Sequence, residues 1–137
     1  MAFVRFRVGE HYTNRDIVDT LHCDERAFLR SAKERGIVAI CLNMAENPNL
    51  PTEIWVGGGP GRARLASALL SECRHQAHKV VPLFVKAATG DEVGAAPWRY
   101  LGAFRATDEE RSAAALATRH RATEPVVRIL YLTRMRD

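Results

Sequence analysis

The sequence predicts an α+β fold, in which a twisted, partly closed β-barrel of five or six strands carries peripheral helices. Short apolar runs typical of strands outnumber the helical stretches, of which there are two or three. The strands and helices do not alternate regularly, as they would in a doubly wound sheet. The 137 residues, 47% of them hydrophobic, suffice for one packed domain over 1–137.

The N-terminal segment predicts a strand followed by a short helix. Residues 3–8 alternate apolar side chains with arginines, the period-two pattern of a half-buried strand. Thr13 or Asn14 is a suitable N-cap for a helix through Leu21, with Asp16 in the first turn.

The next part of the chain predicts a buried strand between less regular segments. Residues 24–35 fit a second polar helix or an irregular turn, with Gly36 as its C-cap. Residues 37–42 are a continuous apolar run, short enough for a strand buried on both faces. Prolines and asparagines make 43–51 a loop, and residues 53–56 resume a strand.

A helix and a long hairpin follow. After the glycines of 57–61, a helix is expected whose apolar face comprises Leu65, Leu69, Leu70 and Cys73. Residues 80–86 and 98–104 then form neighbouring strands joined by a loop over 89–97. Pro82 within the first of these strands predicts an edge position or a bulge.

The C-terminal segments are less regular. Alternation along 98–104 places Trp98, Tyr100 and Phe104 on one face, and packing is their expected role. Residues 108–120 fit a solvated helix or an insertion, and residues 124–134 form the final strand.

Charge and cysteine content narrow the class of protein. The net charge is +4, and arginine, which dominates the basic residues, matches phosphates and base edges well. No apolar run is long enough to span a bilayer, and the charged N-terminus is unlike a signal peptide. Three cysteines without metal-binding spacing indicate reduced thiols, and we expect a cytoplasmic protein that does not bind membranes.

The glycine run has two interpretations. It lacks the Lys-Ser or Lys-Thr of a P-loop, and Arg62 replaces the last glycine of the dinucleotide-binding pattern. It is therefore either a plain tight turn or a phosphate site formed by backbone N–H groups and the following helix N-terminus. The predicted phosphate-binding residues are Gly58, Gly59, Arg62, Arg64, Arg74 and Lys79.

No catalytic constellation is visible in the sequence. Cys73, His75 and His78 share a segment, but their spacing fits no common zinc site. No carboxylate pair, activated serine or activated cysteine stands out. We therefore expect a binding protein without cofactor or metal, rather than an enzyme.

Trp55 is the aromatic residue with the clearest functional expectation. It ends a strand beside the glycine run, where an indole can contact a ligand. We predict that it stacks on a base, with packing in the core as the alternative.

Several segments together resemble SRA domains, the modified-base-binding modules of the PUA superfamily. The helix and strand over 64–70 and 79–85 precede an aromatic strand over 98–104, as in that family. Residues 54–59 occupy the position of the family's aromatic residue and glycine turn. Residues 9–17 are similar to the start of SRA-like modules fused to HNH nucleases in bacterial modification-dependent restriction enzymes.

The resemblance implies a PUA-like barrel that binds duplex DNA and flips a modified base into an aromatic pocket. Trp55 would be one stacking wall. The family's aspartate before the glycine is Leu101 here, and the loop before the aromatic strand is shortened to 43–52. The predicted base-binding residues are Trp55, Asn43, Glu46, Asn47 and Tyr12, with Asn49 as a further candidate for contacts to the base edge.

Three functions remain open at this point. The first is a DNA-binding module for a modified base, either free-standing or associated with a nuclease domain. The second is an RNA-binding domain of the same superfamily, acting in RNA modification or in a toxin system. The third is a small hydrolase, which the absence of a catalytic set disfavours.

Overall fold

The computed structural model describes residues 6–86, 96–121 and 124–135. Residues 3–5 of the predicted strand over 3–8 lie outside the described residues, and residues 6–8 form no strand, so the described half of that prediction is wrong. The predicted loop over 89–97 lies largely outside the described residues. The elements in chain order are β1 (His11–Tyr12), α1 (Asn14–Leu21), β2 (Leu29–Ala32), β3 (Gly36–Asn43), β4 (Glu53–Val56), α2 (Pro60–His75), β5 (Val81–Lys86), β6 (Trp98–Glu110), α3 (Ala113–Leu116) and β7 (Arg128–Met135).

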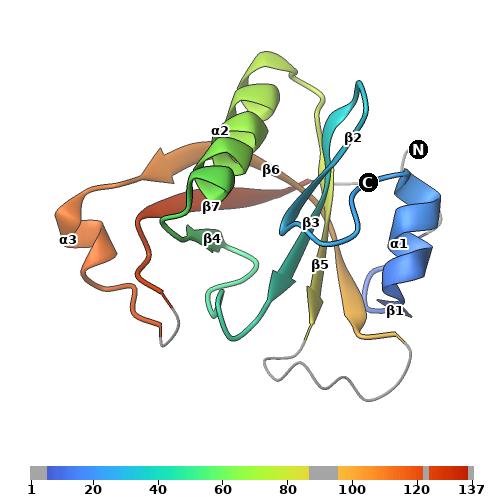
Figure 1. Cartoon of the computed structure of the whole chain (residues 1–137), viewed down its shortest axis with the longest axis horizontal. Helices are drawn as coiled ribbons and strands as arrows, with labels where there is room; N and C mark the ends of the chain where they lie inside the picture. Colours follow the sequence, from blue (N-terminus) through green and yellow to red (C-terminus); the bar gives the residue numbers. More distant parts are fainter. Residues whose placement is uncertain (1–5, 87–95, 122–123, 136–137) are drawn as a thin grey trace.

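The strands form one curled sheet in the order β2-β3-β5-β6-β7-β4, and the two-residue β1 pairs with β6 (Figure 1). All neighbours are antiparallel except β3 and β5. Among the described residues, the end strands β2 and β4 do not pair with each other, so the barrel stays open. These features confirm the predicted α+β class and the twisted, partly closed sheet, and the pairing of β5 with β6 confirms the long hairpin.

Both faces of the sheet centre are buried. On β3, Ile40 and Leu42 pack in the larger hydrophobic cluster, which also contains the buried face of α2. Ala39 and Cys41 point to the other side, into a second cluster with α1. This alternation confirms that 37–42 is a strand buried on both faces.

Two of the helices, α1 and α2, form where the sequence places them. α1 starts at Thr13, one of the two predicted N-caps, which forms a capping box with Asp16. α2 begins with Pro60, and its Leu69, Leu70 and Cys73 are buried as expected. It contacts β2, β3, β4 and β6, and thus lies within the curl of the sheet (Figure 1).

The prediction for residues 24–36 was wrong in two respects. Residues 29–32 form β2 instead of a helix or irregular turn, and pair with β3. Gly36 is not a helix C-cap, because it starts β3 with φ at +72°. The weak apolar face of this segment gives a helix little to bury, whereas strand pairing buries Leu29 completely.

The predicted helix over 108–120 was also wrong for most of its length. β6 continues to Glu110 and pairs with β7, and α3 contains only four residues. Arg128 and Glu109 hold this extension together with an ion pair of 2.6 Å across the two strands. Strand pairing therefore takes up residues 108–110, and the alanines after them form only the short helix α3. The last strand starts at Arg128 instead of residue 124.

The bulge predicted near Pro82 is present, but the edge position is wrong. β5 lies between β3 and β6, and its register with β6 shifts between Leu83 and Phe84. Pro82 pairs with β6 only, because the ladder with β3 begins at Leu83. Its missing N–H therefore costs no bond to β3.

The same irregularity changes the faces of β6. Trp98 and Tyr100 pack in the second cluster beside α1, whereas Phe104 packs in the larger cluster beside α2. Gly102, with φ at +119°, lies between them. The predicted common face of the three aromatics is therefore wrong, although their packing role is confirmed by their burial.

Candidate nucleic-acid interface

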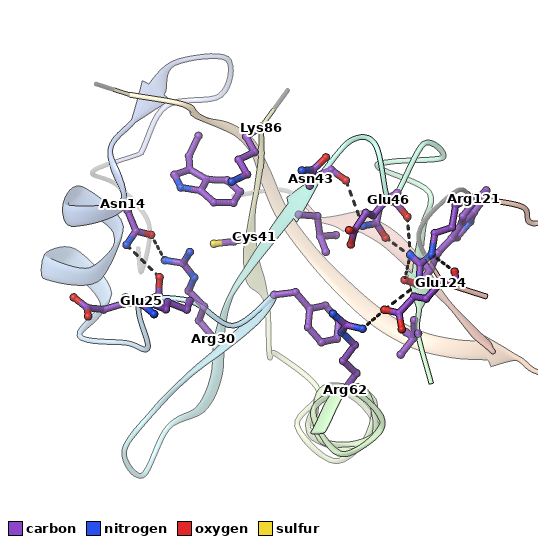
Figure 2. Close-up of a pocket in the computed structure, with 18 residues that line it drawn as sticks. Asn14, Glu25, Arg30, Cys41, Asn43, Glu46, Arg62, Lys86, Arg121 and Glu124 are labelled. Atoms are coloured by element: carbon purple, nitrogen blue, oxygen red, sulfur yellow. Dashed lines mark hydrogen bonds and ion pairs between the residues drawn. The ribbon is translucent and has the colours of Figure 1, made fainter. Parts of the chain in front are cut away.

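An open cavity of about 480 Å³ lies where the ends of β3 and β5 meet the start of α2 (Figure 2). The segment before β2, the loop after β3 and the end of β4 complete its walls. Its lining combines aromatic, amide, cationic and acidic side chains. These are Asn14, Glu25, Arg26, Phe28, Arg30, Cys41, Leu42, Asn43, Glu46, Asn47, Trp55, Val56, Gly57, Arg62, Lys86, Trp98, Arg121 and Glu124.

One end of the cavity, the Trp98 end, is formed by Arg30, Lys86 and Trp98. Arg30 is only 3% exposed, and its guanidinium lies 5.5 Å from the centre of the Trp98 ring. The Lys86 ammonium lies 5.1 Å from the same ring. In the part of the chain that the structure describes, no carboxylate forms an ion pair with either cation. The result is a positively charged aromatic wall.

The opposite end, the Glu124 end, is formed by Arg62, Arg121 and Glu124. Glu124 accepts a hydrogen bond from Arg62, and its carboxylate lies 3.9 Å from Nη2 of Arg121. The Arg121 side chain is 4% exposed, and burial lowers the pKa of its guanidinium. Gly57 lies against Glu124, and a side chain at Gly57 would collide with that carboxylate. At this end, one carboxylate is therefore the acidic partner of both arginines.

Arg121 also fastens the cavity wall. Its Nη1 donates to the backbone oxygens of Glu46 at 2.8 Å and Trp55 at 3.1 Å. Its Nε donates to the backbone oxygen of Glu124 at 2.8 Å. One buried side chain thus ties together the loop after β3, the end of β4 and the segment before β7.

Four of the five predicted base-binding residues line the cavity: Asn43, Glu46, Asn47 and Trp55. Asn47 is buried and accepts a hydrogen bond from the Trp55 N–H at 2.9 Å. The Asn43 side-chain oxygen accepts from Ala45 N–H at 2.7 Å. Among the described residues, the Asn43 amide nitrogen and the Glu46 carboxylate make no hydrogen bond. These two groups can donate to and accept from a ligand.

The fifth residue, Tyr12, lies elsewhere. Its ring packs edge-on against Phe6, with ring centres 5.0 Å apart, and its hydroxyl accepts a hydrogen bond from Arg7 N–H at 2.7 Å. Tyr12 is not part of the cavity lining.

The Trp55 side chain is mostly buried. Only 7% of the residue is exposed, and it packs with Val126 and Ile129. Its indole N–H donates to Glu53 at 2.7 Å, and Glu53 also binds Arg119 through both carboxylate oxygens at 2.9 Å. Stacking of Trp55 on a base stays a prediction.

The structure separates the predicted phosphate-binding residues into two groups. Gly59 caps the start of α2, with Gly58, Arg62 and Arg64 close to it in the chain. Arg74 lies in the last turn of this helix, about 18 Å from Arg62 by the helical rise, and Lys79 follows the end of the helix.

The two groups also differ in their contacts. Arg64 is exposed and makes no hydrogen bond or ion pair among the described residues. Arg74 donates to the Thr107 backbone oxygen at 3.1 Å, and Lys79 pairs with Glu72 at 3.1 Å. The start of α2 is therefore the part of the predicted set that adjoins the cavity.

Sequence reasoning missed Arg30, Lys86, Arg121 and the cavity position of Trp98. Arg30 lies in the segment that was expected to be helical or irregular, so the sequence did not predict that its side chain points into the cavity from β2. Lys86 and Trp98 stand at the two ends of the predicted hairpin strands, and their juxtaposition was the signal that could have identified this wall.

The described residues contain no group of three or more metal-ligating side chains. Burial raises the pKa of the Cys41 thiol to about 12, so this cavity cysteine stays protonated at neutral pH. No helix among the described residues is long and apolar enough to cross a membrane.

No protein-family model and no curated protein matches the sequence. Among solved structures, the chain is similar to one described as "Modification dependent TagI restriction endonuclease". The TM-score is 0.52 and the sequence identity is 18%, with 96% of this chain and 50% of that chain covered. This chain therefore spans half the length of the TagI chain, and the similarity concerns the fold.

Proposed function

We propose that this protein is a DNA-binding module that recognises a modified base in duplex DNA, as the targeting domain of a modification-dependent restriction system. The cavity carries the proposal, because it combines aromatic, amide and cationic groups. The SRA-like segments of the sequence and the fold similarity to the TagI endonuclease support it.

The cavity suits a base that has been flipped out of the duplex. Its volume lies within the range of about 300–1,000 Å³ that is typical of ligand sites. A flipped base is held by stacking and by hydrogen bonds to its polar edge. Phe28, Trp55 and Trp98 are the aromatic residues of the lining, and Asn43 and Glu46 offer a free donor and a free acceptor for the edge.

The surroundings of the cavity suit the DNA backbone. Arg26, Arg62 and Arg64 are exposed, and the first two line the cavity. Cations in these positions can neutralise the phosphates that flank a flipped nucleotide. In this proposal the chain binds DNA without cutting it, and cleavage belongs to a separate nuclease domain.

The test is a binding comparison between duplexes that differ in one base. We expect tighter binding to a duplex with 5-methylcytosine or 5-hydroxymethylcytosine than to the unmodified duplex, measured by fluorescence anisotropy. A wider panel of modified bases would identify the preferred one. Equal affinity for all modified and plain duplexes would contradict the proposal, and tighter binding of RNA would favour the RNA-binding alternative.

Salt titration shows whether DNA binds at the start of α2. Each phosphate contact contributes a slope near −0.9 to a plot of log affinity against log salt. Replacing Arg62 and Arg64 by alanine should flatten the slope by about two units. Arg74→Ala, at the other end of the same helix, is the matched control and should leave it unchanged. An unchanged slope in the double variant would move the binding face elsewhere.

A further inference from the structure

The Trp98 end of the cavity holds two cations that no carboxylate among the described residues neutralises. Arg30 is 3% exposed, and Lys86 is partly buried. Both lie over the Trp98 ring, at 5.5 Å and 5.1 Å from its centre, so the two positive charges are at most about 11 Å apart. Like charges in a poorly hydrated site repel, and an anion between them would relieve that repulsion.

The Arg30 guanidinium is oriented but not saturated. Its Nε donates to the Ala27 backbone oxygen at 3.2 Å, and Nη1 donates to the side-chain oxygen of Asn14. The Asn14 amide nitrogen in turn donates to the Glu25 backbone oxygen at 3.2 Å, which fixes the orientation of that amide. Among the described residues, Nη2 has no hydrogen-bond partner. A guanidinium has five donors, so at least two remain for a ligand.

Glu25, a carboxylate residue of the lining, does not neutralise these two cations. It is exposed, and its carboxylate pairs at 3.7 Å with the guanidinium of Arg15, which is not a lining residue. Lys86 has no hydrogen bond from its ammonium group to any described residue. Among the described residues, its ammonium contacts the indole face of Trp98.

We propose that Arg30, Lys86 and Trp98 form an anion subsite inside the cavity, which binds a negatively charged group of the nucleotide that enters it. The inference rests on the proposed function, which supplies the nucleotide. The anion is either the phosphate of that nucleotide or an acidic substituent on its base. Because Arg30 is almost fully buried, the subsite serves a group that enters the cavity, and not a phosphate that stays on the duplex surface.

The first experiment compares small ligands by isothermal titration calorimetry. If the phosphate occupies the subsite, 5-methylcytidine 5′-monophosphate binds about tenfold tighter than 5-methylcytidine, the gain expected from charge-assisted hydrogen bonds. Lys86→Gln removes most of that preference. Arg74→Gln, a charge removed at the far end of α2 and outside the cavity lining, preserves it.

The second experiment distinguishes the two sources of the anion. If an acidic base substituent occupies the subsite, a duplex with 5-carboxylcytosine binds about tenfold tighter than one with 5-methylcytosine, and Lys86→Gln abolishes this difference. Arg30→Lys retains the positive charge but loses the planar guanidinium with its paired donors. It should therefore reduce the preference for 5-carboxylcytosine less than Arg30→Gln does. Thermal melting of each variant verifies folding, and Lys86→Gln decides the case if the Arg30 variants unfold.

The subsite is overturned if neither ligand pair shows a charge preference, or if the preference survives in Lys86→Gln. Such a result can coexist with a clear preference for methylated duplex, which would leave the proposed function intact. Conversely, a Lys86-dependent gain for the monophosphate, without any preference among duplexes, would uphold the subsite and contradict the proposed function.

Discussion

The two ends of the cavity contain similar cations in opposite electrostatic situations. At the Glu124 end, Arg62 and Arg121 share an acidic partner, and Arg121 holds three backbone oxygens in place. At the Trp98 end, Arg30 and Lys86 lie beside an aromatic ring, and no carboxylate among the described residues pairs with either cation. The first arrangement is complete without a ligand, and the second is not.

This difference separates structural from ligand-binding cations. A charged side chain whose partners are all present in the free protein stabilises the fold, and its removal should lower the free energy of unfolding. A buried cation without an acid costs stability and is retained for another reason, for which ligand binding is the natural explanation. Removal of the buried Arg121 at the Glu124 end should therefore change stability, and variants at the Trp98 end should change binding.

The largest effect is expected behind the Glu124 end, at Trp55. Trp55→Ala should lower the free energy of unfolding by about 3–5 kcal/mol, because a large buried ring leaves a cavity. Chemical denaturation measures this loss. If Trp55 also stacks on a base, binding at a temperature where the variant is folded should weaken by a further 1–3 kcal/mol or so. A variant with wild-type stability would contradict the packing role, and one that still prefers modified DNA would exclude the stacking role.

Arg121 should give the next largest effect. Arg121→Gln removes donors from three backbone oxygens, and we expect a loss of about 2–3 kcal/mol in the free energy of unfolding. Arg62→Gln is the matched control at the same end: its side chain is 48% exposed, so the change should stay within about 0.5 kcal/mol. If the two variants lose the same free energy of unfolding, the contacts of Arg121 with the backbone oxygens do not stabilise the fold as proposed.

A smaller, pH-dependent effect is expected at Glu53. Burial by itself would raise the pKa of this carboxyl, but hydrogen bonds from Arg119, Trp55 and Asn49 outweigh it and hold the pKa below its ordinary value. A lowered pKa in the folded state contributes stability above the unfolded pKa of about 4.3, and that contribution is lost as the pH falls through the folded value.

Denaturation of wild type and Glu53→Gln across pH measures this contribution. The wild type should be more stable near neutral pH, and the two curves should converge at acidic pH. A stability difference that does not change with pH would mean that the Glu53 charge contributes nothing to the fold.

Much of the fold was predictable because local signals and tertiary packing agree. The capping box at Thr13 and the apolar run over 37–42 each favour one structure, and each structure formed. The helix prediction was wrong for residues 108–110. The alanines that follow favour a helix, but pairing with β7 and the Glu109–Arg128 ion pair favour a strand at 108–110. Such long-range competition is invisible in a local window.

The candidate site was predictable only in part, for a similar reason. Asn43, Glu46 and Asn47 follow one strand closely in sequence, so their common position could be inferred. Arg30 and Lys86 meet at one indole only because the sheet curls and β3 pairs in parallel with β5. No sequence motif predicts that Arg30 and Lys86 lie at the same ring, since the two residues are far apart in the chain.

The smallest expected effect concerns Glu124, whose negative charge should weaken DNA binding. Glu124 occupies Arg62, so a phosphate must compete with this carboxylate for the guanidinium. Glu124→Gln should remove this competition and strengthen DNA binding a few-fold, with little change in the log–log salt slope, because Arg62 already counts as one phosphate contact in the wild type. Glu25→Gln, at a lining carboxylate beside Arg15, is the control and should change the affinity less. Fluorescence anisotropy at several salt concentrations measures both variants. Weaker binding by Glu124→Gln would reverse this assignment: the acid would then position Arg62 for the phosphate, and a cation paired in the free protein would count among those that bind the ligand.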